Sequence, residues 1–203
     1  SQEVPKPLVR VRGKTILEWQ LDYLIPHTEK IIISLGFRAQ EIQAFVQQHY
    51  TGKNISFAIE KEPCGTAGGL RLALLQSNAK NALVLNCDDI TDISFSEMEG
   101  KKEHTICVAH PRLPFGLVKE KNGFAVFEEK PILNEWVSCG WYVFQREKLM
   151  PLLPEKGSLE YDLFPNIQLR IHYHTGFWKP LNTPKDLEEF EKMELPQLLR
   201  ANQ

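Results

Sequence analysis

An abrupt change from apolar to acidic residues marks the stretch 84–92. The apolar residues 82–85 predict a strand buried on both faces, and Asp88, Asp89 and Asp92 follow it closely. In an open α/β sheet, ligands bind beyond the carboxyl ends of the strands. Carboxylates at that place suit Mg²⁺ held jointly with the phosphates of a nucleotide. The alternative is an Asp-rich turn that caps a helix, because Asp and Thr favour both roles.

Composition sets the class of protein. A chain of 203 residues with 42% hydrophobic and 25% charged residues predicts a soluble globular domain. The net charge of −2 gives no electrostatic case for a nucleic-acid or anionic-membrane partner. No apolar run approaches the roughly 20 residues that span a bilayer, and no signal peptide is visible. The four cysteines contain no CxxC pair, so zinc is not expected, and free thiols indicate a reducing cytoplasm.

The first half of the chain alternates between strand and helix patterns. Strands are predicted at 9–11, 30–35, 55–59 and 82–85. Helices are predicted at 15–25, with Thr15 as N-cap, at 39–49 and at 70–76. Such alternation predicts a mainly parallel sheet with right-handed crossovers.

The pattern changes after Gly100 to strands joined by short turns. These strands are predicted at 105–109, 116–119, 124–128 and 137–144, as a meander added to the sheet. A short helix near 146–153, an edge strand at 171–174, a loop at 178–183 and a charged helix at 184–193 complete the chain. The fold class is therefore α/β: a Rossmann-like open mixed sheet, mainly parallel, flanked by helices, with a small antiparallel insertion. We expect one domain over residues 1–203.

Segments that could bind a ligand recur at or just beyond the predicted strand ends. They are Lys6, the glycine-rich residues 65–69, Asp88, residues 128–131 and residues 178–183. A glycine-rich turn leading into a helix offers free backbone N–H groups to a phosphate or a base. The alternative is that Gly68 and Gly69 only let a helix pack closely on the sheet. In isolation, Lys6 and Lys130 are typical solvated surface lysines.

Taken in order, these segments resemble one family, the sugar-1-phosphate nucleotidyltransferases, over nearly the whole chain. Residues 5–9 (PKPLV) resemble its PKPLV segment, 62–68 (EPCGTAG) its EPLGTAG, and 83–88 (LVLNCD) its LVLNGD. Residues 115–116 and 127–131 (FEEKP) resemble its YG and FEEKP motifs, and 139–144 (CGWYVF) its AGIYVF. Residues 163–165 and 177–179 match the closing motifs. Each match is weak alone, but their order and spacing together are specific.

The resemblance implies an enzyme that condenses a nucleoside triphosphate with a sugar 1-phosphate to give a nucleoside-diphosphate sugar and pyrophosphate. It implies positioning and charge neutralisation rather than covalent catalysis. The implied catalytic residues are Lys6, Asp88 and Lys130, with Asp88 holding Mg²⁺. The implied nucleotide-binding residues are Glu60, Gly65 and Thr66, and the sugar-binding residues are Gly116, Glu129 and Gly140. Residues 1–100 would then form the nucleotide-binding half and residues 101–203 the sugar-phosphate-binding half.

Glu60 bears on the choice of base, since relatives that use pyrimidines carry Gln there. A carboxylate only accepts hydrogen bonds, and guanine offers it two adjacent donors, whereas uracil and thymine offer one N–H between two carbonyls. If Glu60 faces the pocket, it favours GTP and a mannose- or heptose-1-phosphate type of acceptor. The alternative is a solvated residue at a strand end.

The sequence departs from the family pattern twice. The family's glycine-rich phosphate loop, GxGxR, should precede Pro5, and we expect such a segment before Ser1 in the natural protein. Where relatives close the metal site with the Asp of WxDIGTP, this chain has Pro180 in WKPLNTP. Asn182 can replace that Asp through its amide oxygen, or it is only an Asn in a turn before a helix.

These departures keep two alternatives open. One is a non-catalytic nucleotide-sugar-binding relative, and the other is a cytidylyltransferase for a polyol or choline phosphate. The intact Lys6, Asp88 and Lys130 favour catalysis, and residues 128–131 with Gly140 favour a sugar. The resemblance is also compatible with a homodimer, because relatives are often dimeric. The sugar, the base and the oligomeric state stay open.

Overall fold

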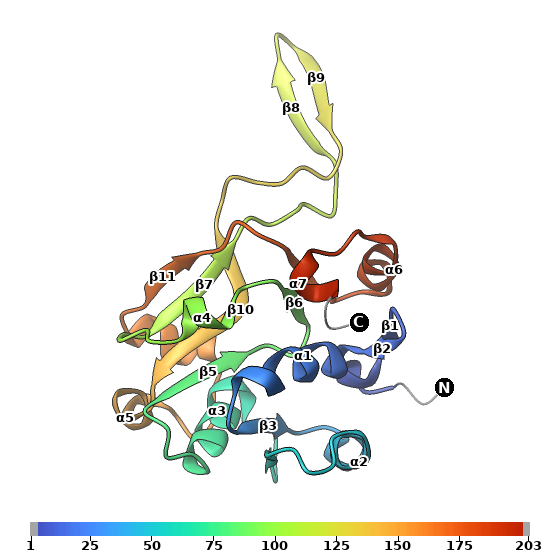
Figure 1. The fold of residues 1–203 in the computed structure, drawn as a ribbon. Helices are drawn as coiled ribbons and strands as arrows, with labels where there is room; N and C mark the ends of the chain where they lie inside the picture. The colour runs from blue at the N-terminus through green and yellow to red at the C-terminus, as the bar shows by residue number, and fades with distance from the viewer. Residues whose placement is uncertain (1–3, 201–203) are drawn as a thin grey trace.

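The computed structural model describes residues 4–200 and has the predicted mixed α/β architecture (Figure 1). The strands are β1 Arg10–Val11, β2 Lys14–Thr15, β3 Ile31–Leu35, β4 Ile55–Ile59, β5 Asn81–Leu85, β6 Asp89–Thr91, β7 Thr105–Ala109, β8 Leu117–Lys121, β9 Phe124–Glu128, β10 Val137–Gln145, β11 Arg170–Tyr173 and β12 Trp178–Pro180. The α-helices are α1 Ile16–Leu24, α2 Ala39–His49, α3 Gly65–Leu75, α4 Phe95–Met98, α5 Arg146–Leu149, α6 Pro184–Lys192 and α7 Gln197–Arg200. Short 3₁₀ turns lie at Lys6–Leu8, Ile25–His27, Met150–Leu152 and Phe164–Asn166, and a π-helical turn at Leu159–Leu163.

The main sheet is mixed, with strand order β11-β7-β10-β5. β10 runs antiparallel to both of its neighbours, and β11 runs parallel to β7, so three of the four strands share one direction. β3 and β4 form a separate parallel pair. Within residues 4–200, β5 has a ladder on one edge only, to β10. Its apolar residues Ala82–Leu85 are half-buried, and they pack on both faces as predicted, Leu83 and Leu85 against one core and Ala82 and Val84 against the other.

Two cores cover the two faces of the main sheet, and β10 contributes to both. Trp141 and Val143 pack with Tyr23, Ile93 and Met98 on one face. Tyr142 and Phe144 pack on the other, with α3, α5 and the Leu159–Leu163 turn. The alternation follows from the two-residue period of a strand. It makes β10 the strand on which both layers are assembled.

Helix α1 begins as predicted, at the cap formed by Thr15. The Thr15 hydroxyl accepts a hydrogen bond from the Glu18 N–H, and the Glu18 carboxylate accepts one from the Thr15 N–H, which makes a capping box. Its buried residues, including Ile16, Leu17 and Leu21, recur at helical spacing. No helix within residues 4–200 is long and apolar enough to cross a membrane.

Helix α3 begins five residues before the predicted start. Residues 65–69 form its first turns rather than a turn leading into it, so that prediction was wrong. Packing is the reason: a Cβ at Gly68 would lie 2.5 Å from the Glu155 carbonyl oxygen, and one at Gly69 would lie 2.7 Å from the Ser34 Oγ. Small residues let this helix approach β3 and the loop before Gly157 closely. These contacts agree with the simpler interpretation of Gly68 and Gly69, and the binding role of residues 65–69 stays a prediction.

The β8–β9 hairpin projects away from the rest of the molecule (Figure 1). The two strands pair with each other from Leu117–Glu128 to Lys121–Phe124, and all residues of β9 are exposed. The sequence predicted that these strands extend the main sheet, but only β7 and β10 do so. By the pairing register, one face of the hairpin carries Val118, Ala125 and Phe127 with one charged residue, Glu120, and large apolar residues are exposed on both faces.

Candidate active site

Three polar side chains from distant parts of the chain meet beyond the carboxyl end of β5. The Lys6 ammonium donates to Asp88 Oδ2 at 2.5 Å and to Asn182 Oδ1 at 2.9 Å. All three were predicted as site residues, and the structure brings them together. The side chains of Lys6 and Asp88 are 40% and 26% exposed, so the group is accessible to a ligand.

A short ladder places Asn182 beside Asp88. β6 follows Asp88 and pairs antiparallel with β12, with Trp178 opposite Thr91 and Pro180 opposite Asp89. Residues 178–183 were predicted as a loop, and the strand was missed because three residues show no period. The register continues past the strand, since the Leu181 N–H donates to the Asp88 carbonyl oxygen at 2.8 Å. Asn182 comes next along the chain.

The donor atoms of this group suit a hard cation. Asp88 and Asn182 each offer an oxygen, and both oxygens contact the same Lys6 nitrogen. Among the described residues no cluster of three or more His, Cys, Asp or Glu side chains forms a self-contained metal site. Mg²⁺ commonly takes one or two protein oxygens and completes its shell with substrate phosphates and water, so the residues present fit that ion.

The other two carboxylates of the acidic stretch have structural roles. Asp89 is buried and accepts hydrogen bonds from Trp178 Nε1 at 2.8 Å and Asn86 Nδ2 at 3.3 Å. Burial raises the pKa of Asp89 to about 6. Asp92 accepts from the Phe177 N–H at 2.7 Å and lies 3.0 Å from His174 Nε2. Asp89 and Asp92 therefore bind residues 177–178, at the start of β12, and hold them against β6.

Gly140 lies against the buried Asp89. Its φ is +77°, and a Cβ there would lie 2.1 Å from Asp89 Oδ2. The Gly140 carbonyl also accepts from the Asn86 N–H at 2.8 Å. The close approach that requires glycine is therefore made by a carboxylate of the same chain. The predicted sugar contact at Gly140 stays a prediction.

Lys130 belongs to a second charged group, which it forms with Lys179 and with two acids of α6. Its ammonium donates to Glu189 Oε1 at 2.9 Å, and Lys179 donates to Glu189 Oε2 at 2.8 Å and to Asp186 Oδ1 at 3.0 Å. The hydrogen bonds from Lys179 and Lys130 lower the pKa of Glu189 to about 2. The hydrogen bond from Glu189 raises the pKa of Lys130. Sequence reasoning missed Asp186 and Glu189, which look like ordinary surface charges on a helix, and it gave Lys179 of the segment 178–183 no role.

The residues predicted to bind the nucleotide base make their contacts at the start of α3. The Glu60 carboxylate accepts from the Cys64 N–H at 3.1 Å. The Thr66 hydroxyl accepts from the Leu159 N–H at 2.9 Å, and Gly65, with φ +74°, approaches the carbonyl of Gly157. Gly65 and Thr66 thus hold α3 to the loop at 157–159. Their roles in nucleotide binding are not tested by these contacts.

Two of the residues predicted to bind the sugar, Gly116 and Glu129, flank the hairpin. Gly116 lies directly under the Phe127 ring, since a Cβ there would be 2.1 Å from Phe127 Cζ. Glu129 is exposed and precedes Lys130. The glycine-rich loop expected before Pro5 lies outside the described residues.

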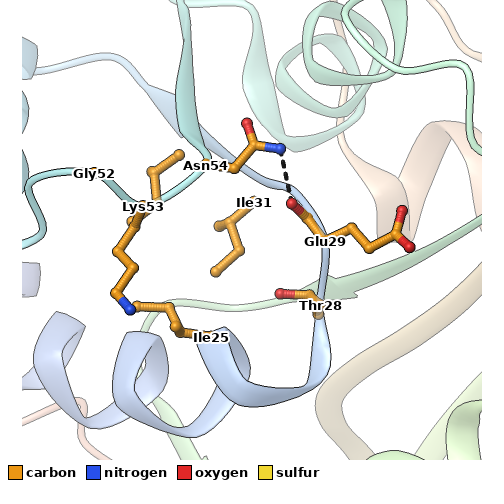
Figure 2. Close-up of a pocket in the computed structure, with 8 residues that line it drawn as sticks. Ile25, Thr28, Glu29, Ile31, Gly52, Lys53 and Asn54 are labelled. Atoms are coloured by element: carbon orange, nitrogen blue, oxygen red, sulfur yellow. Dashed lines mark hydrogen bonds between the residues drawn. The ribbon is translucent and has the colours of Figure 1, made fainter.

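A cavity of about 180 Å³ lies elsewhere, at the amino ends of β3 and β4 (Figure 2). It is lined by Ile25, Thr28, Glu29, Ile31, Gly52, Lys53, Asn54 and Ile55. The Asn54 amide donates to the Glu29 carbonyl oxygen at 2.7 Å across its rim. Ligands in open α/β sheets bind at the opposite, carboxyl ends of the strands, so we assign the site to the group around Asp88.

Comparison with known proteins agrees with the geometry. The sequence model of a family described as nucleotidyl transferase matches residues 1–167. A mannose-1-phosphate guanylyltransferase catalytic subunit beta from Drosophila melanogaster is 32% identical over 202 residues, covering 90% of this chain and 55% of that protein. The protein of the same name from Xenopus tropicalis is 33% identical over 204 residues, covering 90% and 57%. The chain therefore spans about half the length of the curated relatives it matches.

Solved structures share the fold. HddC from Yersinia pseudotuberculosis, crystallised in complex with GMP-PN, has a TM-score of 0.76 at 21% identity, covering 95% of this chain and 91% of that one. A putative glucose-1-phosphate thymidylyltransferase from Bacillus anthracis has a TM-score of 0.68 at 16% identity, covering 96% and 90%. With the family match over most of its length, the chain belongs to the nucleotidyl transferase family.

Proposed function

We propose that the protein transfers a nucleotidyl group from a nucleoside triphosphate to a sugar 1-phosphate, releasing pyrophosphate. The observation that carries the proposal is the convergence of Lys6, Asp88 and Asn182 beyond the end of β5. Family membership and the names of the relatives support it. Lys6 and Asp88 come from the first half of the chain, and Asn182 and Lys130 from the second. The site therefore lies where the two predicted halves meet.

In the proposed reaction, a phosphate oxygen of the sugar phosphate attacks the α-phosphorus of the nucleotide, and the bond to pyrophosphate breaks. Asp88 and Asn182 would hold Mg²⁺, which would supply neutralising charge to the nucleotide phosphates. Lys6 donates to the α-phosphate or to the departing pyrophosphate, where negative charge accumulates. Lys130 binds the phosphate of the acceptor and orients it for in-line attack. The chain supplies no nucleophile of its own.

We further propose GTP as the donor and a mannose-1-phosphate type of acceptor. The carboxylate of Glu60, held by the Cys64 N–H at the start of α3, is an acceptor that matches the two adjacent donors of guanine. The relatives named mannose-1-phosphate guanylyltransferase support the same choice. The four free cysteines fit a reducing compartment such as the cytoplasm.

Pyrophosphate release with Mg²⁺ tests the proposal. GTP, UTP, CTP and dTTP are each paired with mannose 1-phosphate and glucose 1-phosphate, and Asp88→Asn is the control. We expect release with GTP and mannose 1-phosphate that falls at least a hundredfold in the control, whose thermal unfolding verifies that it is folded. Greater release with UTP than with GTP would refute the Glu60 argument.

Two other results would favour the alternatives. Nucleotide binding without release across the whole panel would indicate a non-catalytic relative. Release only with CTP and a polyol or choline phosphate would indicate a cytidylyltransferase.

A further inference from the structure

A continuous line of polar contacts joins the two charged groups of the site through the beginning of α6. Asp186 Oδ2 accepts from the Asn182 N–H at 3.2 Å, and Asp186 Oδ1 accepts from Lys179. Lys179 in turn donates to Glu189, whose other oxygen accepts from Lys130. One end of this line is the Asn182 beside Asp88, and the other is the lysine assigned to the acceptor phosphate. Lys179, Asp186 and Glu189 have no role in the proposed reaction so far.

The geometry of this line separates it from ordinary surface ion pairs. The Lys179 side chain is only 13% exposed, and each oxygen of Glu189 is bound by a different lysine. Asp186 is also fixed, because its Oδ2 accepts from the Thr183 N–H at 2.9 Å within the capping box of α6. Networks with several fixed members keep their geometry better than isolated exposed pairs.

The backbone of Lys130 is equally constrained. Its φ is +46°, a left-handed conformation that is unfavourable for a residue with a side chain. Its carbonyl oxygen accepts from Arg112 Nη1 at 3.0 Å. Glu189 therefore contacts a lysine whose main chain is already held, so that contact decides where the ammonium points.

We propose that Glu189 is a positioning residue for Lys130, and that the line Glu189–Lys179–Asp186 sets the location of the acceptor phosphate relative to Asn182. The inference rests on the proposed function. An ammonium has three N–H donors, and Glu189 takes one of them. The remaining two are free to bind the phosphate of the acceptor while the carboxylate fixes their direction. Glu189 touches no reacting atom and acts through Lys130.

Steady-state kinetics test the inference with Glu189→Gln and the matched control Glu188→Gln, an exposed residue next to it on the same helix. For Glu189→Gln we expect the KM for the sugar 1-phosphate to rise about fivefold, the upper range for a partly exposed ion pair. The KM for the nucleotide should match the control, and the melting temperature should fall by at most about 2–4 °C, since one partly exposed ion pair is lost. An unchanged KM for the sugar phosphate would overturn the inference. A rise of both KM values together with a fall of the melting temperature beyond that range would also overturn the inference, because it indicates a structural role.

A second measurement separates this inference from the proposed function. Limited acetylation followed by mass spectrometry reports how strongly each lysine amine is protected. Loss of Glu189 should increase acetylation of Lys130 and Lys179 at least twofold, with the exposed Lys121 as internal reference. Equal labelling of Lys130 in both variants would refute the positioning role whatever the activity. Absence of nucleotidyl transfer in the wild-type protein, with the labelling change present, would reject the proposed function alone and leave the ion-pair line intact.

Discussion

Replacing Gly140 by Ala should destabilise the protein far more than a left-handed backbone alone explains. Ala at φ +77° costs about 1–2 kcal/mol. Its Cβ would also lie 2.1 Å from Asp89 Oδ2 and 2.9 Å from Asn86 Nδ2. The buried carboxylate must move, which weakens its 2.8 Å hydrogen bond from Trp178 and costs about 1.5–3 kcal/mol more. We therefore expect a total loss of about 2.5–5 kcal/mol.

Gly100→Ala is the matched control for this prediction. Gly100 has φ +76° and no neighbouring atom within 4 Å of an added Cβ, so it isolates the backbone cost of about 1–2 kcal/mol. Urea unfolding followed by circular dichroism gives both free energies of unfolding. At roughly 2–4 °C per kcal/mol for a chain of this size, the two melting temperatures should also separate clearly.

A double-mutant cycle with Asp89→Ala completes the test. Without the carboxylate the added methyl group meets only the Asn86 amide, which has lost its hydrogen bond to Asp89 and can move, so Gly140→Ala should then cost little more than Gly100→Ala. Equal losses for the two glycine variants in the wild-type background would refute the steric argument. So would a Gly140→Ala loss that Asp89→Ala leaves unchanged.

Four shorter predictions follow from the same contacts. Asn182→Ala should raise the Mg²⁺ concentration needed for half-maximal pyrophosphate release about tenfold, whereas Asn182→Asp should not. Thr15→Ala removes the α1 capping box and should cost about 1 kcal/mol in urea unfolding. Glu189 has its pKa lowered to about 2 in the fold, so its stabilising contribution is complete above the unfolded value near 4.5 and is lost as pH falls towards 2. Acid titration of unfolding should therefore show wild type losing more stability than Glu189→Gln, by at most about 1 kcal/mol because the side chain is 36% exposed. Burial raises the pKa of Cys139 to about 12, so a thiol reagent at pH 8 should modify it only after unfolding.

Regular elements with a clear hydrophobic period were predictable from sequence. Helix α2 and strand β4 have the predicted bounds, because local periodicity and burial agree there. The start of α3 was wrong because glycine is a poor helix former, and only the loop at 155–157 explains why it is required. β12 was missed because its pairing with β6 is a tertiary contact that three residues cannot encode locally.

The residues of the candidate site also fall into those that could be predicted from the sequence and those that could not. Lys6, Asp88 and Asn182 could be predicted because short motifs at the strand ends identify them, and the carboxyl ends of strands lie at one edge of a sheet. Glu189 could not, because an acid on a charged helix looks like any solvated residue. Only the tertiary packing of α6 brings Glu189 to its partners, Lys130 and Lys179.

The three lysines of the candidate site are all held by oxygens of the same chain, and this bears on how they would bind phosphates. Lys6, Lys130 and Lys179 each donate to oxygens of the same chain, so their side chains are ordered before any ligand arrives. Ordering long side chains beforehand reduces the entropy lost on binding. Lys6 uses one N–H for Asp88 and one for Asn182, which leaves a third, and Lys130 uses one for Glu189, which leaves two. In the proposed reaction, the oxygens that hold these lysines would direct the remaining donors without occupying them, which is the preorganisation that in-line phosphoryl transfer requires.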